Sequence, residues 1–162
     1  QSFQITPLQL MRAASAAVNG GTLVTPHFGM KAVDSSGKTV KTFEFAKKKN
    51  VIKKETSETM RELLEAVVSE GSGRNCKIEG YSIGGKTATS EKLPRGTGKY
   101  ISSFLGFSKA EHPTVMALVM IDEPKGTYYG GTIAAPVVRE VFKVALPYLG
   151  ISKDYTVDKT KK

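Results

Sequence analysis

The chain has 162 residues, of which 40% are hydrophobic and 24% are charged, and its formal net charge is +9. This length and balance predict one globular domain with a core of its own. The longest apolar run, residues 115–121, is far shorter than the roughly 20 residues that a membrane-spanning helix needs. Because the sequence opens at Gln1 and reaches a helix start within a few residues, we expect it to be a piece of a longer protein.

The positive charge predicts attraction to anionic polymers or acidic lipid surfaces. The lysines gather in residues 47–54 and in a tail, residues 152–162, and neither segment interleaves the aromatic residues that stack on bases. We therefore expect no nucleic-acid partner, and we expect the tail to be disordered. Cys76 is the only cysteine, which excludes an intrachain disulfide. His27 and His112 lack metal-ligand spacing, so we expect no metal and no cofactor.

Three helices are predicted. A capping box at residues 6–9 begins the first, which ends near Gly20. The second spans about residues 57–70, and the third, with prolines near both ends, spans about residues 133–146 and is expected to be buried. We expect the second helix to face the core through an apolar stripe. The stripe consists of Met60, Leu63, Leu64, Val67 and Val68.

The strand pattern predicts antiparallel pairing. Residues 23–45 alternate around a turn signal at residues 34–38, which indicates a hairpin. Three further strands are expected at residues 82–91, 100–107 and 114–122, joined by short polar connections. Connections this short, without a crossover helix, require antiparallel neighbours. The predicted fold class is therefore α+β, an antiparallel sheet packed with helices.

Residues 84–90 fit two unrelated active-site patterns. Together with Gly80, they match the phosphate-loop pattern through Thr87, and the apolar strand that ends at Asp122 offers a magnesium ligand. A phosphate loop must follow a buried strand and open a helix. Residues 75–80 are too polar for such a strand, and Pro94 with its neighbouring glycines leaves no room for such a helix. A nucleotide-binding protein that uses residues 80–87 is kept as the alternative function.

In the second pattern, residues 84–90 form an extended strand within a series of motifs that follow one another in order. The series consists of residues 4–10, 84–90, 99–107, 117–124 and 128–137. It resembles the C-terminal half of the transpeptidase domain of class B penicillin-binding proteins, and the similarity covers about residues 2–151. The resemblance implies that residues 1–151 are the C-terminal part of a β-lactamase/transpeptidase-like domain, in a parent protein on the outer face of the bacterial cytoplasmic membrane.

The resemblance assigns roles to four residues. The substrate it implies is a cell-wall stem peptide ending in D-alanyl-D-alanine, or a β-lactam that mimics it, and both carry a carboxylate. Thr87 and Thr89 share one face of the strand and bind that carboxylate. Lys86 adds a positive field and contacts the catalytic serine region, and the backbone N–H of Thr89 supplies one oxyanion-hole donor. Ala88 stands where the family usually has glycine, and we expect only a small effect on the shape of the cleft.

Two motifs of the family are missing from the chain. The acylated serine of the family lies in Ser-x-x-Lys at a helix start. The only such pattern here is residues 35–38, where Gly37 marks a hairpin turn, and Ser-x-Asn is absent. We therefore expect the chain alone to be inactive. Membrane contact is expected only through an N-terminal anchor outside the chain, and other cell-wall synthesis proteins are possible partners. A basic module that docks on wall polymers stays open as a non-enzymatic alternative.

Overall fold

The computed structural model describes residues 4–108 and 111–155. These residues divide into two compact units, one formed by Ile5–Ser57 and one by Glu58–Lys162 together with Gln1–Gln4. The expectation of a single transpeptidase region over residues 1–151, followed by a disordered tail, stays a prediction, because residues 156–162 of the tail lie outside the described residues. No helix in the described ranges is both long and apolar enough to cross a bilayer.

The smaller unit opens with helix α1, Pro7–Val18, and the predicted capping box is confirmed. The Thr6 hydroxyl accepts the Gln9 N–H, and the Gln9 side chain accepts the Thr6 N–H in return. These two bonds satisfy donors that the first turn of a helix otherwise leaves unpaired.

The predicted hairpin is also present in the smaller unit, with shorter strands than the alternation suggested. Strand β1, Lys31–Val33, pairs antiparallel with β2, Thr39–Thr42. The Asp34 carboxylate accepts hydrogen bonds from the Ser36 hydroxyl and from the N–H groups of Ser36 and Lys38, and these bonds lower the pKa of Asp34. The lone Ser-x-x-Lys pattern therefore lies in a hairpin turn and not at a helix start.

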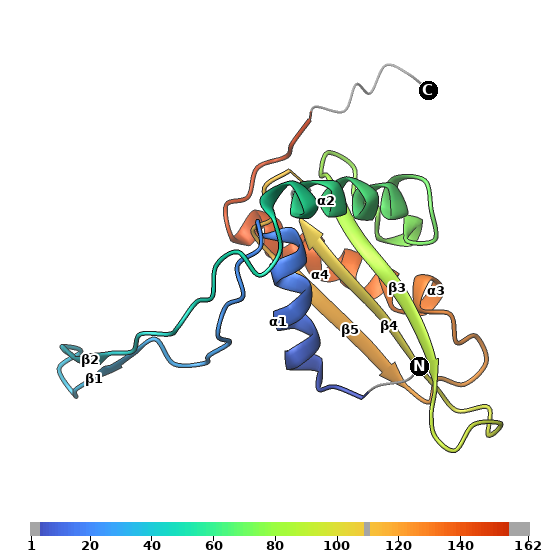
Figure 1. Ribbon diagram of the computed structural model, residues 1–162, viewed down its shortest axis with the longest axis horizontal. Helices are drawn as coiled ribbons and strands as arrows, with labels where there is room; N and C mark the ends of the chain where they lie inside the picture. Colours follow the sequence, from blue (N-terminus) through green and yellow to red (C-terminus); the bar gives the residue numbers. More distant parts are fainter. Residues whose placement is uncertain (1–3, 109–110, 156–162) are drawn as a thin grey trace. The chain divides into compact units, whose positions relative to one another are not determined.

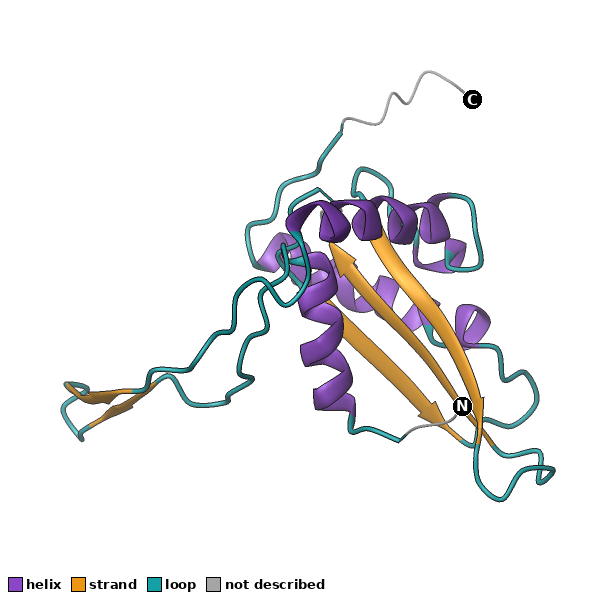
Figure 2. Cartoon of the chain, in the orientation of Figure 1, coloured by secondary structure: helices purple, strands orange, loops and turns teal. Residues whose placement is uncertain are grey.

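The larger unit is built on a three-stranded antiparallel sheet in the order β3-β4-β5 (Figures 1 and 2). The strands are β3, Ile83–Glu91, β4, Tyr100–Ser108, and β5, Met116–Asp122. Each lies within two residues of its predicted bounds, and the antiparallel pairing follows from the short connections. Among the described strands, β3 forms one edge of this sheet.

Helix α2, Lys54–Ser69, begins earlier than predicted and contributes less to the core. Val68 is buried and belongs to the core cluster, whereas Leu63 is 59% exposed and Met60, Leu64 and Val67 are only half-buried. The prediction that the whole stripe faces the core is therefore wrong. The physical reason is that the helix reaches the core cluster only at its last turn, through Val68.

The predicted third helix is present two residues further along the chain, and a short helix that the sequence did not indicate precedes it. Helix α3, Gly130–Ile133, and helix α4, Ala135–Tyr148, are separated by Ala134, and both cover the same face of the sheet (Figure 1). The core lies between α4 and the sheet, and burial of each large apolar side chain there contributes about 1.5–3 kcal/mol. Its largest fully buried members are Phe104, Phe142, Leu146, Val68 and Val138.

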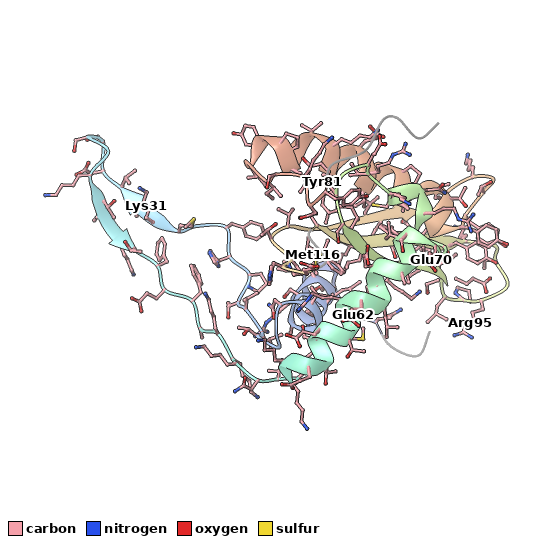
Figure 3. The ribbon with its side chains drawn as sticks, turned by 90° about the horizontal axis from the view of Figure 1, so that it is seen from above. Lys31, Glu62, Glu70, Tyr81, Arg95 and Met116 are labelled. Atoms are coloured by element: carbon pink, nitrogen blue, oxygen red, sulfur yellow. The ribbon has the colours of Figure 1, made fainter. Side chains whose placement is uncertain are left out.

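Between α2 and β3 the chain forms a short 3₁₀ helix, η1, Arg74–Cys76. Figure 3 shows both ends of this connection, Glu70 after α2 and Tyr81 before β3. The connection is anchored by Cys76, whose side chain is fully buried in the core cluster. Burial raises the pKa of the Cys76 thiol to about 12. Polar residues flank this cysteine in the sequence, so local composition does not indicate its burial.

The burial of Cys76 predicts slow thiol chemistry. Because the thiolate is the reactive form, a thiol with a pKa of about 12 is almost fully protonated at pH 7.5. We expect a disulfide reagent to label the folded chain at least about 100-fold more slowly than the chain unfolded in urea, where the thiol has its ordinary pKa. Absorbance of the released thiolate measures both rates. Equal rates would contradict the burial of this side chain.

Candidate functional site

Strand β3 presents the predicted motif on two faces. Thr87 and Thr89 point to one face and are half-buried, whereas Lys86 and Ala88 point to the other and are exposed. The face of the threonines is the one that carries Phe104 of β4, the cross-strand partner of Thr87. The threonine hydroxyls therefore lie on the side of the sheet that α3 and α4 cover.

The backbone of β3 turns alternate N–H and C=O groups away from β4. Just beyond β3, the Lys92 N–H donates to Lys99 O, and this pair continues the register of β3 and β4. Every second residue before Lys92, such as Ser90 and Ala88, therefore bonds to β4 as well. By this alternation the N–H and C=O groups of Thr87 and Thr89 point away from β4, toward the free edge. The Lys86 ammonium donates to Thr87 O at 2.9 Å, which places its charge at the same edge.

A cavity of about 400 Å³ lies beside this part of β3. Of the four residues predicted from the sequence, Thr87, Ala88 and Thr89 line the cavity, and Lys86 does not. The remaining lining comes from two other segments of the larger unit. These lining residues are Ser72, Arg74 and Asn75 around η1, and Tyr129, Gly130, Gly131 and Thr132 around α3.

The segment before α3 is bonded directly to β3. The Gly130 N–H donates to the Thr89 hydroxyl at 3.2 Å, and that hydroxyl lies 3.5 Å from Tyr128 O, to which it donates. Ser102 of β4 also donates its hydroxyl to Tyr128 O. A β-carbon on Gly130 would lie 2.2 Å from Ser103 O, so only glycine fits here. The Thr89 hydroxyl is therefore already engaged by the protein.

The segment around η1 forms the other wall. The hydroxyls of Ser72 and Thr87 lie 3.3 Å apart and share a hydrogen bond. The Asn75 amide donates to Gly131 O at 2.8 Å, which ties this wall to the segment that enters α3. These bonds join three separate parts of the chain around one donor-rich cavity, a suitable arrangement for an anion.

One tyrosine, Tyr129, lines the cavity beside α3, and its neighbour Tyr128 supports it. The Tyr128 ring stacks on Tyr100 at 4.1 Å between centroids, and Tyr129 lies against it, 59% exposed. The hydrogen bond between the two phenols raises the pKa of the Tyr129 hydroxyl above its ordinary value. Tyr129 is therefore uncharged at neutral pH and offers the cavity an apolar face and a phenol.

Sequence reasoning missed the wall around η1. The signal that could have found it is the run Gly71-Ser72-Gly73, directly after a predicted helix and ahead of the predicted strand. A β-carbon on Gly73 would lie 3.1 Å from both Phe104 and Val67 O, so the chain approaches the core closely there. Residues 128–137 belong to the motif series, but the sequence does not indicate their hydrogen bonds to Thr89.

Comparison with known proteins gives the family. The family model described as the penicillin binding protein transpeptidase domain matches residues 1–143. This chain belongs to the penicillin-binding protein transpeptidase family. Stage V sporulation protein D of Bacillus subtilis is 46% identical over 156 residues, which cover 93% of this chain and 24% of that relative. The probable peptidoglycan D,D-transpeptidase PenA of Neisseria flavescens is 36% identical over 155 residues, covering 93% of this chain and 36% of that protein.

Solved structures share the fold of this chain. Penicillin binding protein 3 of Mycobacterium tuberculosis, in its apo form, has a TM-score of 0.82 at 24% identity, covering 96% of this chain and 38% of that chain. The same protein complexed with ampicillin has a TM-score of 0.82 at 23% identity, covering 99% of this chain and 38% of that chain. The chain thus spans about a quarter to two fifths of the length of these relatives. The class B resemblance is confirmed, and the nucleotide-binding alternative has no support.

Proposed function

We propose that this chain supplies one wall of the active-site cleft of a peptidoglycan D,D-transpeptidase, an enzyme that cross-links stem peptides through an acyl-serine intermediate and that β-lactams acylate. The observation that carries the proposal is the position of residues 86–89. They lie on an exposed sheet edge, and three of them line a cavity rich in hydrogen-bond donors. The family match and the names of the relatives support the same activity.

The residues have distinct proposed roles. Thr87 binds the substrate carboxylate through its hydroxyl, Lys86 supplies positive charge at the strand edge, and the Thr89 N–H is one donor of the oxyanion hole. The free edge of β3 supports a further step. An acyl donor in extended conformation can lie along it and exchange backbone hydrogen bonds, as an added strand does. Ala88 is exposed and its methyl group leaves the cavity open, so the departure from glycine is compatible with binding.

The nucleophile is proposed to come from a part of the parent outside this chain. Ser35 of the lone Ser-x-x-Lys pattern lies in a hairpin turn, where no helix N-terminus supports it. We also propose that the parent is exposed on the outer face of the cytoplasmic membrane, because its substrate is cell-wall peptide. Its proposed ligands are the D-alanyl-D-alanine stem peptide and β-lactams, as the solved complexes of a structural relative with aztreonam and ampicillin suggest.

A labelled penicillin tests the proposal. We expect a covalent adduct on the chain extended upstream to include a Ser-x-x-Lys motif, and none on residues 1–162 alone. Gel fluorescence and intact-protein mass measure the adduct. A variant of the extended chain in which that serine is replaced by alanine is the matched control. A stable adduct at Ser35 of the short chain, or no adduct on the extended chain, would contradict the proposal.

A further inference from the structure

The lining of the cavity includes one positively charged side chain, Arg74, that is not part of the motif on β3. Of the described residues that line it, Arg74 is the only one with a formal charge. Lys86 is outside the lining, and its ammonium group donates to the backbone at Thr87 O. An anionic ligand inside the cavity therefore has the Arg74 guanidinium as its nearest source of full positive charge among the described lining residues.

Hydrogen bonding and its neighbours hold Arg74 in place at the first position of η1. Its Nε donates to Gly71 O at 3.2 Å, which fixes the stem of the side chain and leaves the terminal nitrogens for other partners. Its neighbours in η1 are anchored on both sides, Asn75 by its bond to Gly131 O and Cys76 by complete burial. Within the described ranges, Arg74 forms no salt bridge, so its charge is not neutralised by the protein.

A count of hydroxyl donors shows why an additional donor matters. Ser72 and Thr87 share one hydrogen bond, so the pair has a single hydroxyl hydrogen left for a ligand. The Thr89 hydroxyl donates to Tyr128 O and accepts from Gly130 N–H, so its hydrogen is in use. A carboxylate has two oxygens and about four acceptor sites. These three hydroxyls leave one hydrogen for it. The other hydroxyls of the described lining, those of Tyr129 and Thr132, are uncharged donors, so full positive charge comes from Arg74.

We propose that Arg74 binds the C-terminal carboxylate of the acyl donor, together with the Ser72 and Thr87 hydroxyls, and is a specificity-determining residue for anionic acyl donors. This inference rests on the proposed transpeptidase function. The terminal nitrogens of a guanidinium can donate two parallel hydrogen bonds to one carboxylate, a geometry that an ammonium group lacks. The chain thus selects its acyl donor by charge from the η1 wall as well as from the β3 edge.

The test compares two penicillins on the full-length protein that contains this chain, one with its free carboxylate and one as the methyl ester. The second-order acylation rate is measured by intact-protein mass for the wild type, Arg74→Met and Arg74→Lys. Lys77→Met, a charge loss at an exposed neighbour outside the cavity lining, is the matched control. The ratio of the two rates is the readout, because partial misfolding lowers both rates equally and leaves their ratio unchanged.

We expect Arg74→Met to lower the rate of the carboxylate compound about tenfold, the size of one charge-assisted interaction, and the ester by less than about twofold. Arg74→Lys should recover part of the loss, and Lys77→Met should match the wild type. An unchanged carboxylate-to-ester ratio in Arg74→Met would overturn the role of Arg74 while leaving the transpeptidase proposal intact. No adduct on the wild type with either compound would overturn both.

Discussion

Replacing Lys86 with alanine is expected to lower the rate at which penicillin acylates the full-length protein by about 100- to 1,000-fold. The physical reason is that Lys86 is the charged member of the β3 motif and holds its ammonium at the strand edge through Thr87 O, 2.9 Å away. The oxyanion that forms on acylation is proposed to lie at that same edge, near the Thr89 N–H. Loss of one pre-positioned donor or charge at a developing oxyanion typically has this effect.

A second lysine, Lys92, provides the control. Lys92 follows β3 and forms ion pairs with Asp122 and Glu123, at 2.9 and 2.8 Å, away from the cavity lining. Exposed ion pairs contribute little to stability, so Lys92→Ala should acylate at nearly the wild-type rate. Stopped-flow fluorescence with a labelled penicillin measures all three proteins. If Lys86→Ala and Lys92→Ala acylate equally fast, Lys86 has no role in the chemistry.

The fold was predictable where local sequence chemistry and tertiary packing agree. The capping box at Thr6, the turn at residues 34–38 and the three strands of the sheet all follow from short-range patterns that the structure confirms. The prediction that the whole apolar stripe of α2 faces the core was wrong. Helical periodicity identifies an apolar face but does not show what covers it, and only Val68 of the stripe belongs to the core cluster. Helix α3 was missed because it has only four residues, too few for a periodic pattern to indicate a helix.

The site was predictable only along one strand. Residues 86–89 form a contiguous motif, so sequence alone could place Thr87 and Thr89 on one face of β3. The remaining lining residues come from η1 and from the segment entering α3, which are distant in sequence and meet β3 only through tertiary hydrogen bonds. The bond between Ser72 and Thr87 and the bond between Asn75 and Gly131 are of this kind. No pattern in a single sequence indicates which of these polar side chains will form a hydrogen bond with which partner.

The close approach of the α3 segment to β3 leads to the second large prediction, the substitution Gly130→Ala. A β-carbon at this position would lie 2.2 Å from Ser103 O and 2.5 Å from Ala88 O. Both oxygens are backbone atoms facing each other across the β3–β4 ladder, so neither can move without disturbing the sheet. We expect a loss of about 3 kcal/mol in the free energy of unfolding, combining overpacking with loss of the bond from Gly130 N–H to Thr89.

Urea unfolding of the chain, followed by circular dichroism, measures this loss as a lower midpoint at an unchanged slope. Gly29→Ala is the matched control. A β-carbon there has only the edge of the Phe43 ring within reach, at 4.0 Å, so its effect should stay within about 0.5 kcal/mol. In the full-length protein, Gly130→Ala should also slow acylation, because a displaced α3 segment releases the Thr89 side chain beside the proposed oxyanion donor. Wild-type stability in Gly130→Ala would show that the α3 segment does not pack against β3 as described.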